Sequence, residues 1–125
     1  MATQIRRVAV LGAGVMGQGI AAHLANGGIE SVLFDMVPRD LTEGGDRSIL
    51  ARNGIKNALK ASPAAFYTPS FSDRITAANY EDDAELLKDC DLIIEVVVER
   101  MDIKKIIFDW VQTNRSEGSI VASNT

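Results

Sequence analysis

A glycine-rich hexapeptide directly follows a short apolar run near the N-terminus, and no other feature constrains the fold as strongly. The run covers residues 5–11 and ends Val-Ala-Val-Leu, which is typical of a strand buried on both faces of a parallel sheet. The hexapeptide, residues 12–17, reads Gly-Ala-Gly-Val-Met-Gly and opens a predicted helix over residues 15–26. A strand, a glycine turn and a helix in this order predict the fingerprint of a dinucleotide-binding βαβ unit.

The three glycines of the hexapeptide have separate expected roles. Gly12 makes the tight turn, Gly14 lets the backbone approach a pyrophosphate, and Gly17 lets the helix pack closely on the sheet. The N-terminus of the helix then offers N–H groups and the positive end of its dipole to the phosphates. The alternative is a packing turn that binds no ligand.

The remainder of the chain alternates between apolar runs and helical stretches. Further strands are predicted over residues 32–34, 75–78, 91–98 and 119–125. Helices are predicted over residues 42–60, 81–89 and 102–112, and a packed loop or short helical turn over 61–74. Strands that alternate with helices are joined by right-handed crossovers. The sequence therefore predicts an α/β fold, a doubly wound parallel sheet of strand order 3-2-1-4-5.

The length of the chain allows one domain, and its composition is that of an average globular protein. Its 125 residues end at the fifth predicted strand, so we expect a Rossmann domain over residues 1–125 that is truncated before a sixth strand. The 17 Asp and Glu residues outnumber the 13 Lys and Arg residues, which argues against nucleic acid as a partner. One histidine and one cysteine exclude a disulfide framework and argue against a metal site. Glycines and polar residues interrupt the uncharged stretch 8–29, so we expect no membrane insertion and a cytoplasmic location.

Asp35 ends the second predicted strand, where a doubly wound fold would place an adenosine ribose. Its carboxylate would accept hydrogen bonds from the ribose hydroxyls and repel the 2′-phosphate of NADP, so the sequence favours NAD. Arg39 follows in the loop and could accommodate a 2′-phosphate, but the carboxylate occupies the position that specifies the cofactor. The alternative is an ordinary loop carboxylate.

The strongest strand signal in the chain is followed by a polar residue. Val97 and Val98 end this β-branched run, Glu99 follows it, and the predicted sheet order places all three at the ligand crevice. Lys104 lies on the next helix and could fold back toward Glu99 or the cofactor. A helix-start carboxylate with a solvated lysine explains the spacing equally well.

Three stretches of the chain carry a family resemblance. They are residues 8–21, residues 93–100 with 103–104 and 107–108, and Ala-Ser-Asn-Thr at 122–125. In this order they resemble the NAD-binding domain of the 3-hydroxyacyl-CoA dehydrogenases, over essentially the whole chain. Residues 64–69, Ala-Ala-Phe-Tyr-Thr-Pro, are similar to a bacterial long-chain branch in which this domain begins a larger polypeptide. Val96 departs from the family, which commonly has alanine there.

The hexapeptide and the resemblance together predict one set of NAD contacts. The set is Gly12, Ala13, Gly14, Val15, Met16, Gly17, Asp35, Val97, Val98, Glu99, Lys104 and Asn124. The resemblance further implies that the complete enzyme oxidises a 3-hydroxyacyl-CoA substrate to the 3-oxoacyl-CoA in fatty-acid β-oxidation. The family's catalytic His–Glu pair and helical substrate domain come later than the matched residues. No catalytic residue is therefore predicted within this chain.

Several reactive residue types have simpler interpretations. His23 lies on the first predicted helix, where packing or exposure is expected. Cys90 lies between two aspartates, which would raise the pKa of its thiol and make it unreactive. Arg52, Lys56 and Lys60 line one helical stripe. This stripe is a solvated face or, by the family resemblance, a contact for coenzyme A phosphates.

A second class of function uses the same glycine loop and Asp35. The chain would then be a free-standing module that senses NAD and NADH through a protein partner. The two functions differ in whether the natural reading frame continues into a segment with a His–Glu pair. In either case the unpaired outer edge of the fifth strand favours self-association into a homo-oligomer.

Overall fold

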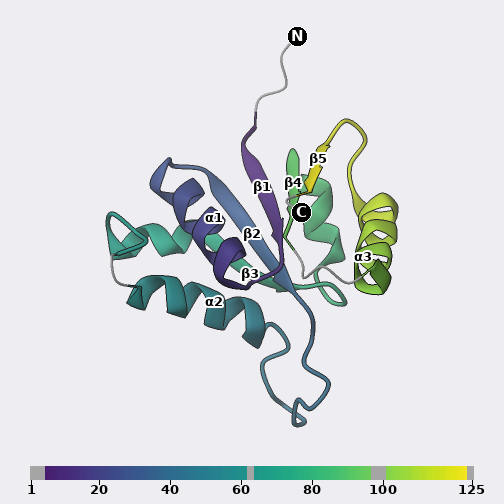
Figure 1. The fold of residues 1–125 in the computed structure, drawn as a ribbon, viewed down its shortest axis with the longest axis horizontal. Coiled ribbons are helices and arrows are strands. Elements are labelled where there is room, and N and C mark those ends of the chain that lie inside the picture. The colour runs from purple at the N-terminus through teal and green to yellow at the C-terminus, as the bar shows by residue number, and fades with distance from the viewer. Residues whose placement is uncertain (1–4, 62–63, 97–100, 124–125) are drawn as a thin grey trace.

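Five parallel strands form one sheet in the order β3-β2-β1-β4-β5 (Figure 1). The structure is a computed structural model that describes residues 5–61, 64–96 and 101–123. In chain order the strands are β1 (Arg7–Leu11), β2 (Glu30–Asp35), β3 (Ile75–Asn79), β4 (Leu92–Glu95) and β5 (Ile120–Ser123). Each pair of neighbouring strands is parallel, so the predicted sheet and its strand order are confirmed.

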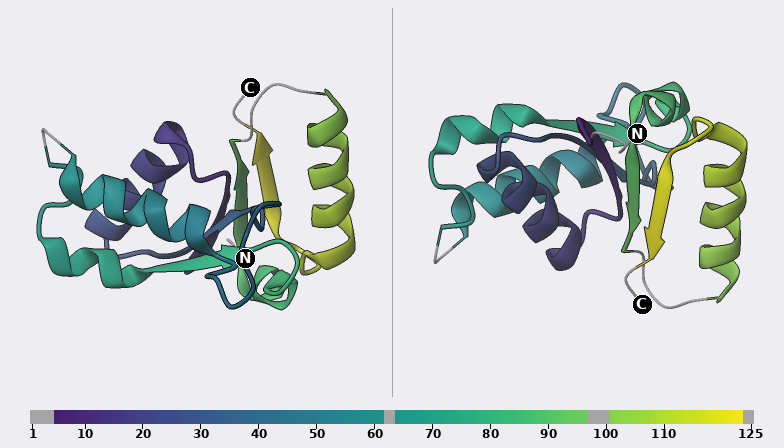
Figure 2. Two further views of the ribbon diagram at one scale, coloured as in Figure 1. Left: turned by 90° about the horizontal axis from the view of Figure 1, so that it is seen from below. Right: turned by 90° about the horizontal axis from the view of Figure 1, so that it is seen from above.

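Helices cover both faces of this sheet, as Figure 2 shows. The helices α1 (Val15–Asn26) and α2 (Ile49–Lys60) pack on one face, together with the 3₁₀ helix η1 (Pro69–Arg74). The 3₁₀ helix η2 (Ala84–Asp89) and the helix α3 (Met101–Asn114) pack on the other face. This two-sided cover is the predicted doubly wound arrangement. Within the described ranges, no helix is both long and apolar enough to cross a lipid bilayer.

The central strand β1 divides its side chains between two cores. Val8 and Val10 belong to the core under α1 and α2, whereas Ala9 and Leu11 belong to the core on the α3 side. Successive side chains of a strand point to opposite faces, and all four are fully buried here. Burial on both faces is therefore the reason for the continuous apolar run.

The helix predicted over residues 42–60 is wrong in its first part, because α2 begins only at Ile49. The preceding residues form a loop in which Gly44 has a φ of 82°. In the same loop Asp46 Oδ1 accepts a hydrogen bond from Ser48 N at 3.0 Å. A carboxylate bound to the backbone two residues further on stabilises a turn in place of a helix.

The acidic helix predicted over residues 81–89 is shorter and tighter than expected. A turn precedes η2, because Asn79 Oδ1 accepts hydrogen bonds from Glu81 N at 3.0 Å and from Asp82 N at 2.7 Å. These amides are therefore bound to a side chain, as in other Asx turns. The other predicted elements agree with the structure to within two residues at each described end. Residues 97–98 and 124–125 of the predicted strands lie outside the described residues.

Gly17 is the position at which we expect a single methyl group to disturb this fold most. A Cβ there would lie 1.8 Å from the carbonyl oxygen of Gly12, so Gly17→Ala must displace backbone. We expect a loss of about 3 kcal/mol in the free energy of unfolding, the upper end of overpacking costs. Urea denaturation measures this loss.

Gly19→Ala is the matched control, because a Cβ at Gly19 on the same helix would meet nothing within 4 Å. Alanine is a better helix former than glycine, so this variant should gain about 0.5–1 kcal/mol. Equal stability of the two variants would contradict the close packing of α1 on the loop.

Candidate functional site

The loop between β1 and α1 has the backbone that the glycine pattern predicts. Gly12 has a φ of 114°, a conformation that side chains disfavour, and its N–H donates to Phe34 O at 2.8 Å. This bond fastens the turn to the neighbouring strand β2. Gly17 lies against the same turn, as shown above, and Val96 Cγ2 would lie 3.3 Å from its added Cβ. The valine that departs from the resembled family therefore packs beside the third glycine.

The N-terminus of α1 opens toward solvent. Its N-cap residue, Gly14, provides no side-chain cap, and the first turn contains no acidic residue. Val15 is 88% exposed and Met16 is 55% exposed. A Cβ at Gly14 would meet nothing within 4 Å, so the described residues leave the space beside this backbone open. An uncapped helix N-terminus with an open approach fits an anionic group such as a diphosphate.

Asp35 joins the end of β2 to the glycine loop. Its Oδ2 accepts a hydrogen bond from Ala13 N at 2.8 Å, and its Oδ1 accepts one from Met36 N at 2.7 Å. Two backbone amides thus fix the half-buried carboxylate beside the N-terminus of α1. Ala13 and Asp35 are both predicted cofactor contacts, but the bond between them was not predicted.

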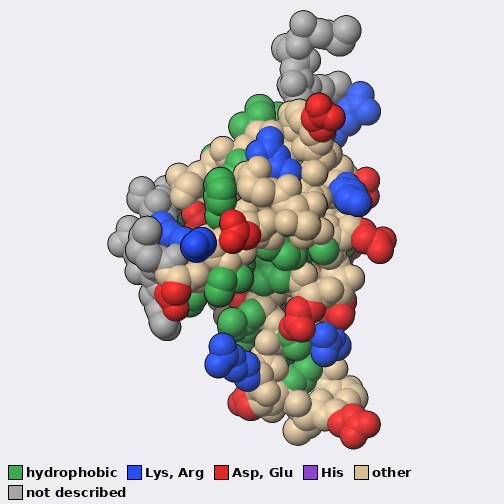
Figure 3. All heavy atoms as spheres, turned by 90° about the vertical axis from the view of Figure 1, so that its right-hand side faces the viewer, with side chains coloured by type: hydrophobic (Ala, Val, Ile, Leu, Met, Phe, Trp, Pro, Cys, Tyr) green, Lys and Arg blue, Asp and Glu red, His purple; other side chains and the backbone are tan. Residues whose placement is uncertain are grey.

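Lys104 lies on α3, which covers the opposite face of the sheet from α1. It is half-buried on α3 and lines a groove of about 920 Å³ between α3 and β5. Apolar side chains gather among charged ones on this face of the molecule (Figure 3). Val97, Val98, Glu99 and Asn124 lie outside the described residues.

Glu95 is a charged residue at the crevice that the sequence analysis missed. It lies at the end of β4, in register with Leu11 of β1 and Ser123 of β5, and its Oε2 accepts a hydrogen bond from Ser123 Oγ. The pair lines the same groove as Lys104. In doubly wound sheets the crevice lies where the strand order reverses, and here that is between β1 and β4. The sequence does contain a signal for this residue, because Glu95 interrupts an otherwise apolar run.

The remaining reactive residue types lie in ordinary environments. His23 is exposed in the last turn of α1, at the far end of the helix from the glycine loop. Cys90 is buried, and burial raises the pKa of its thiol to about 12, with a smaller contribution from the flanking aspartates. The raised thiol pKa agrees with the prediction, but its main cause is desolvation and the aspartates contribute less. Arg52 forms an ion pair with Asp46 at 2.5 Å, while Lys56 and Lys60 are exposed.

This chain is similar to part of several known dehydrogenases and fatty-acid oxidation enzymes. Residues 7–125 match the family described as "3-hydroxyacyl-CoA dehydrogenase, NAD binding domain". Over its whole length the chain is 50% identical to a probable 3-hydroxyacyl-CoA dehydrogenase of Bacillus subtilis, of which it spans 17%. It is 38% identical to a putative fatty acid oxidation complex trifunctional enzyme of Rickettsia prowazekii, of which it also spans 17%. A crystal structure of 3-hydroxybutyryl-CoA dehydrogenase from Escherichia coli K12 matches 98% of this chain and 25% of its own, with 25% identity and a TM-score of 0.71.

Gly14→Val tests the open approach to α1. Because Gly14 has an ordinary φ of −70° and empty space around it, we expect the variant to fold normally. The added side chain would fill the space that a diphosphate needs, so NADH affinity should fall about tenfold or more, which is about 1.4 kcal/mol or more. Circular dichroism and NADH fluorescence titration measure the two effects.

Gly19→Ala again provides the control, since it adds a methyl group to open space further along the helix. Unchanged NADH affinity in Gly14→Val would contradict a phosphate cradle at this loop. Unfolding of Gly14→Val would favour the alternative of a packing turn without a ligand.

Proposed function

Because this chain belongs to the NAD-binding domain family of the 3-hydroxyacyl-CoA dehydrogenases, we propose that its glycine loop, α1 and Asp35 hold the adenosine diphosphate half of NAD. The observation that carries this proposal is the 2.8 Å bond from Ala13 N to Asp35 Oδ2. It sets a fixed carboxylate beside an uncapped, solvent-open helix N-terminus. A ribose and a diphosphate are adjacent in NAD and need these two environments side by side.

The hydrogen-bonding capacity of Asp35 supports a ribose contact. A carboxylate offers about four lone-pair sites. The N–H groups of Ala13 and Met36 each use one of them. The remaining capacity suits the two ribose hydroxyls. The negative charge would repel a 2′-phosphate, so we propose selectivity for NAD over NADP.

We propose that the nicotinamide half lies toward β4 and α3. Lys104, Val97, Val98, Glu99 and Asn124 are the proposed contacts there, of which Lys104 is within the described residues. Its position beside Glu95 and Ser123, at the carboxyl ends of β4 and β5, supports this assignment. When bound, NAD supplies the acceptor for a hydride.

We propose further that the complete enzyme oxidises a 3-hydroxyacyl-CoA and works in the cytoplasm, with this domain over residues 1–125. The chain's only histidine, His23, lies exposed on α1 away from the glycine loop, so it is no candidate for the general base. The alternative of an NAD-sensing module is not favoured, because the curated relatives reported above are named as dehydrogenases or fatty-acid oxidation enzymes. We also propose that the protein self-associates through the edge strand β5.

Asp35→Ser tests the choice of cofactor. Removing the carboxylate removes a charged hydrogen-bond acceptor, an interaction of about 1.5–3 kcal/mol, so NADH affinity should fall about 10- to 150-fold. The affinity for NADPH should fall less or rise, because the repulsion of its 2′-phosphate is gone. Parallel titrations with NADH and NADPH measure both.

Arg39→Ser is the companion variant for this test, because Arg39 is exposed on the loop after β2 and is the other candidate for a 2′-phosphate contact. If Asp35 decides, Arg39→Ser keeps the preference for NADH. Equal affinities of the unmodified protein for NADH and NADPH would contradict the assignment.

The division between cofactor binding and catalysis can be tested directly. The 125-residue chain, mixed with NAD and 3-hydroxybutyryl-CoA, should form no measurable NADH, because positioned acid–base groups alone contribute about 10²–10⁴-fold to such rates. A titration of the same sample with NADH should show binding. Robust turnover would place the catalytic groups within these residues and contradict the proposed division.

A further inference from the structure

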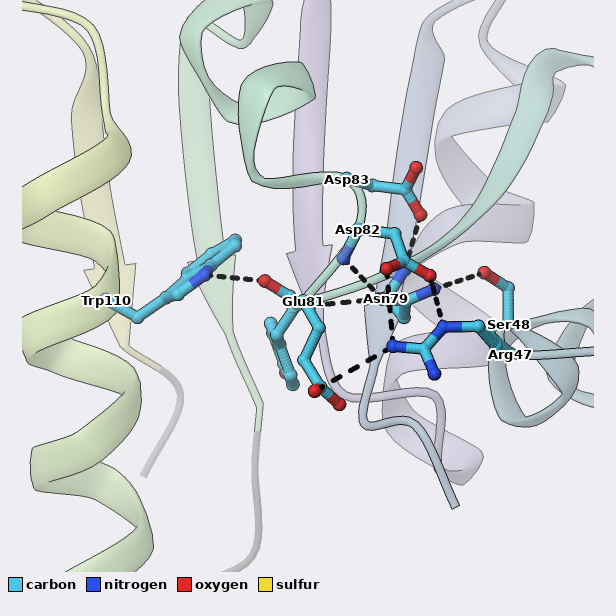
Figure 4. A network of polar contacts seen from close by, with 8 residues as sticks. Arg47, Ser48, Asn79, Glu81, Asp82, Asp83 and Trp110 are labelled. Atoms are coloured by element: carbon cyan, nitrogen blue, oxygen red, sulfur yellow. Dashed lines mark hydrogen bonds and ion pairs between the residues drawn. The ribbon is translucent and has the colours of Figure 1, made fainter. Parts of the chain in front are cut away.

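A buried asparagine organises the ends of β2 and β3, and Figure 4 shows its surroundings. The side chain of Asn79, the last residue of β3, is 1% exposed. Its Nδ2 donates to Ser48 Oγ at 3.0 Å and to Asp82 Oδ2 at 3.2 Å, while its Oδ1 accepts the two turn amides described above. An amide side chain has two donors and two lone pairs, so its whole capacity is used. Asn79 thus connects the turn after β3 to the residue before α2.

An ion pair beside Asn79 connects the same two segments. Arg47 Nε donates to Asp82 Oδ2 at 2.6 Å and Arg47 Nη2 donates to Asp82 Oδ1 at 3.3 Å, a two-pronged contact. The hydrogen bond from Arg47 holds the pKa of Asp82 below its usual value, so the carboxylate is charged at neutral pH. The ion pair therefore fastens the end of the loop 36–48 to the turn 79–83.

The turn 79–83 is the better anchored of the two segments. Trp110 of α3 donates from Nε1 to Tyr80 O at 2.9 Å, and Asn79 N donates to Asp83 Oδ2 at 2.9 Å. The loop 36–48, in contrast, has no regular secondary structure and surrounds a hollow of about 490 Å³. Arg47 lines this hollow. The shape of the loop therefore depends on where its end is held.

Both segments lie next to Asp35. The loop 36–48 follows it directly, and Met36 N donates to its carboxylate. On the other side, Asn79 is its register partner in β3, and Tyr80 N donates to Asp35 O at 3.3 Å. A ribose bound at Asp35 carries its base one glycosidic bond away. Among the described residues, the loop 36–48 and the turn 79–83 are the segments next to Asp35 that can receive the adenine.

We propose that Arg47 and Asp82 are positioning residues for the adenosine half of the cofactor, because their ion pair holds the loop 36–48 in the shape that receives it. This inference rests on the proposed function, since it requires a ribose at Asp35. Without the ion pair the loop samples other shapes. The apparent affinity for the cofactor then falls in proportion to the fraction of molecules whose loop keeps the binding shape. Neither residue needs to touch the cofactor for this effect.

The test uses two variants that remove one charge of the pair, Arg47→Gln and Asp82→Asn, and the double variant Arg47→Gln/Asp82→Asn. Both side chains are about half exposed, at 50% and 45%, so all three proteins should fold, with urea midpoints close to that of the unmodified protein. We expect each single variant to bind NADH and ADP-ribose about 3- to 10-fold more weakly, corresponding to a competent fraction of about a third to a tenth. The double variant should bind NADH and ADP-ribose about as weakly as either single variant, because both single changes break the same ion pair.

Reduced nicotinamide mononucleotide lacks the adenosine half of the cofactor. General damage to the structure would weaken its binding together with that of NADH, whereas loss of the positioning role would not. Its affinity should be the same in all the variants. Arg7→Gln is the matched control, because Arg7 forms a similar exposed ion pair with Glu30 at 3.0 Å. This pair joins the first residues of β1 and β2, at the other end of these strands from Asp35. It should bind NADH normally.

The outcomes separate this proposal from the proposed function. If the unmodified protein binds neither NADH nor ADP-ribose, the cofactor assignment and the positioning role both fail. If it binds both, and the single variants bind them equally well, the positioning role alone is overturned. A loss shared by reduced nicotinamide mononucleotide, or losses of the two single variants that multiply in the double variant, also overturn it.

Discussion

The close approach of α1 to the end of β1 is the constraint on which the candidate site depends. It exists because Gly17 has no side chain, so the helix can lie where a Cβ would be 1.8 Å from Gly12 O. This contact directs the uncapped N-terminus of α1 toward the carboxyl edge of the sheet. There the strand order reverses between β1 and β4. A larger residue would push the helix outward, and its first-turn amides would move with it. Tight packing and the proposed anion binding therefore have one cause in this loop.

The parallel register converts that local geometry into a site made of distant residues. Leu11 pairs with Phe34, so β1 and β2 end level with one another, and the amide of Ala13 meets the carboxylate of Asp35. The next pairing sets Asn79 beside Asp35. Polar side chains thus gather where strands end, because the strand interiors are occupied by core residues. The same edge holds the proposed cofactor contacts and the Arg47–Asp82 ion pair that we propose shapes the loop beside them.

The sequence predicted most of the fold because its local signals agree with one another. Apolar runs, glycine turns and helical spacing all indicated alternating strands and helices, and the sheet order followed from general rules of connection. The errors arose where a polar side chain bonds to nearby backbone. Asp46 forms a turn ahead of α2, and Asn79 binds the amides that would have begun a longer helix. Glu95 was missed because a strand pattern does not show which neighbour a polar residue meets.

By itself the sequence determined the βαβ opening, the identity of its three glycines and the acidic residue that ends β2, because these depend on local backbone geometry and residue type. Only the tertiary structure decided that Ala13 bonds to Asp35, that Lys104 shares a groove with Glu95, and that Arg47 is fastened to Asp82. The bonds Ala13–Asp35 and Arg47–Asp82 join residues 22 and 35 positions apart, and the groove is lined by residues of β4, α3 and β5. Their partners are chosen by strand register and by helix placement, which the packing of the whole sheet sets and no short stretch of sequence encodes.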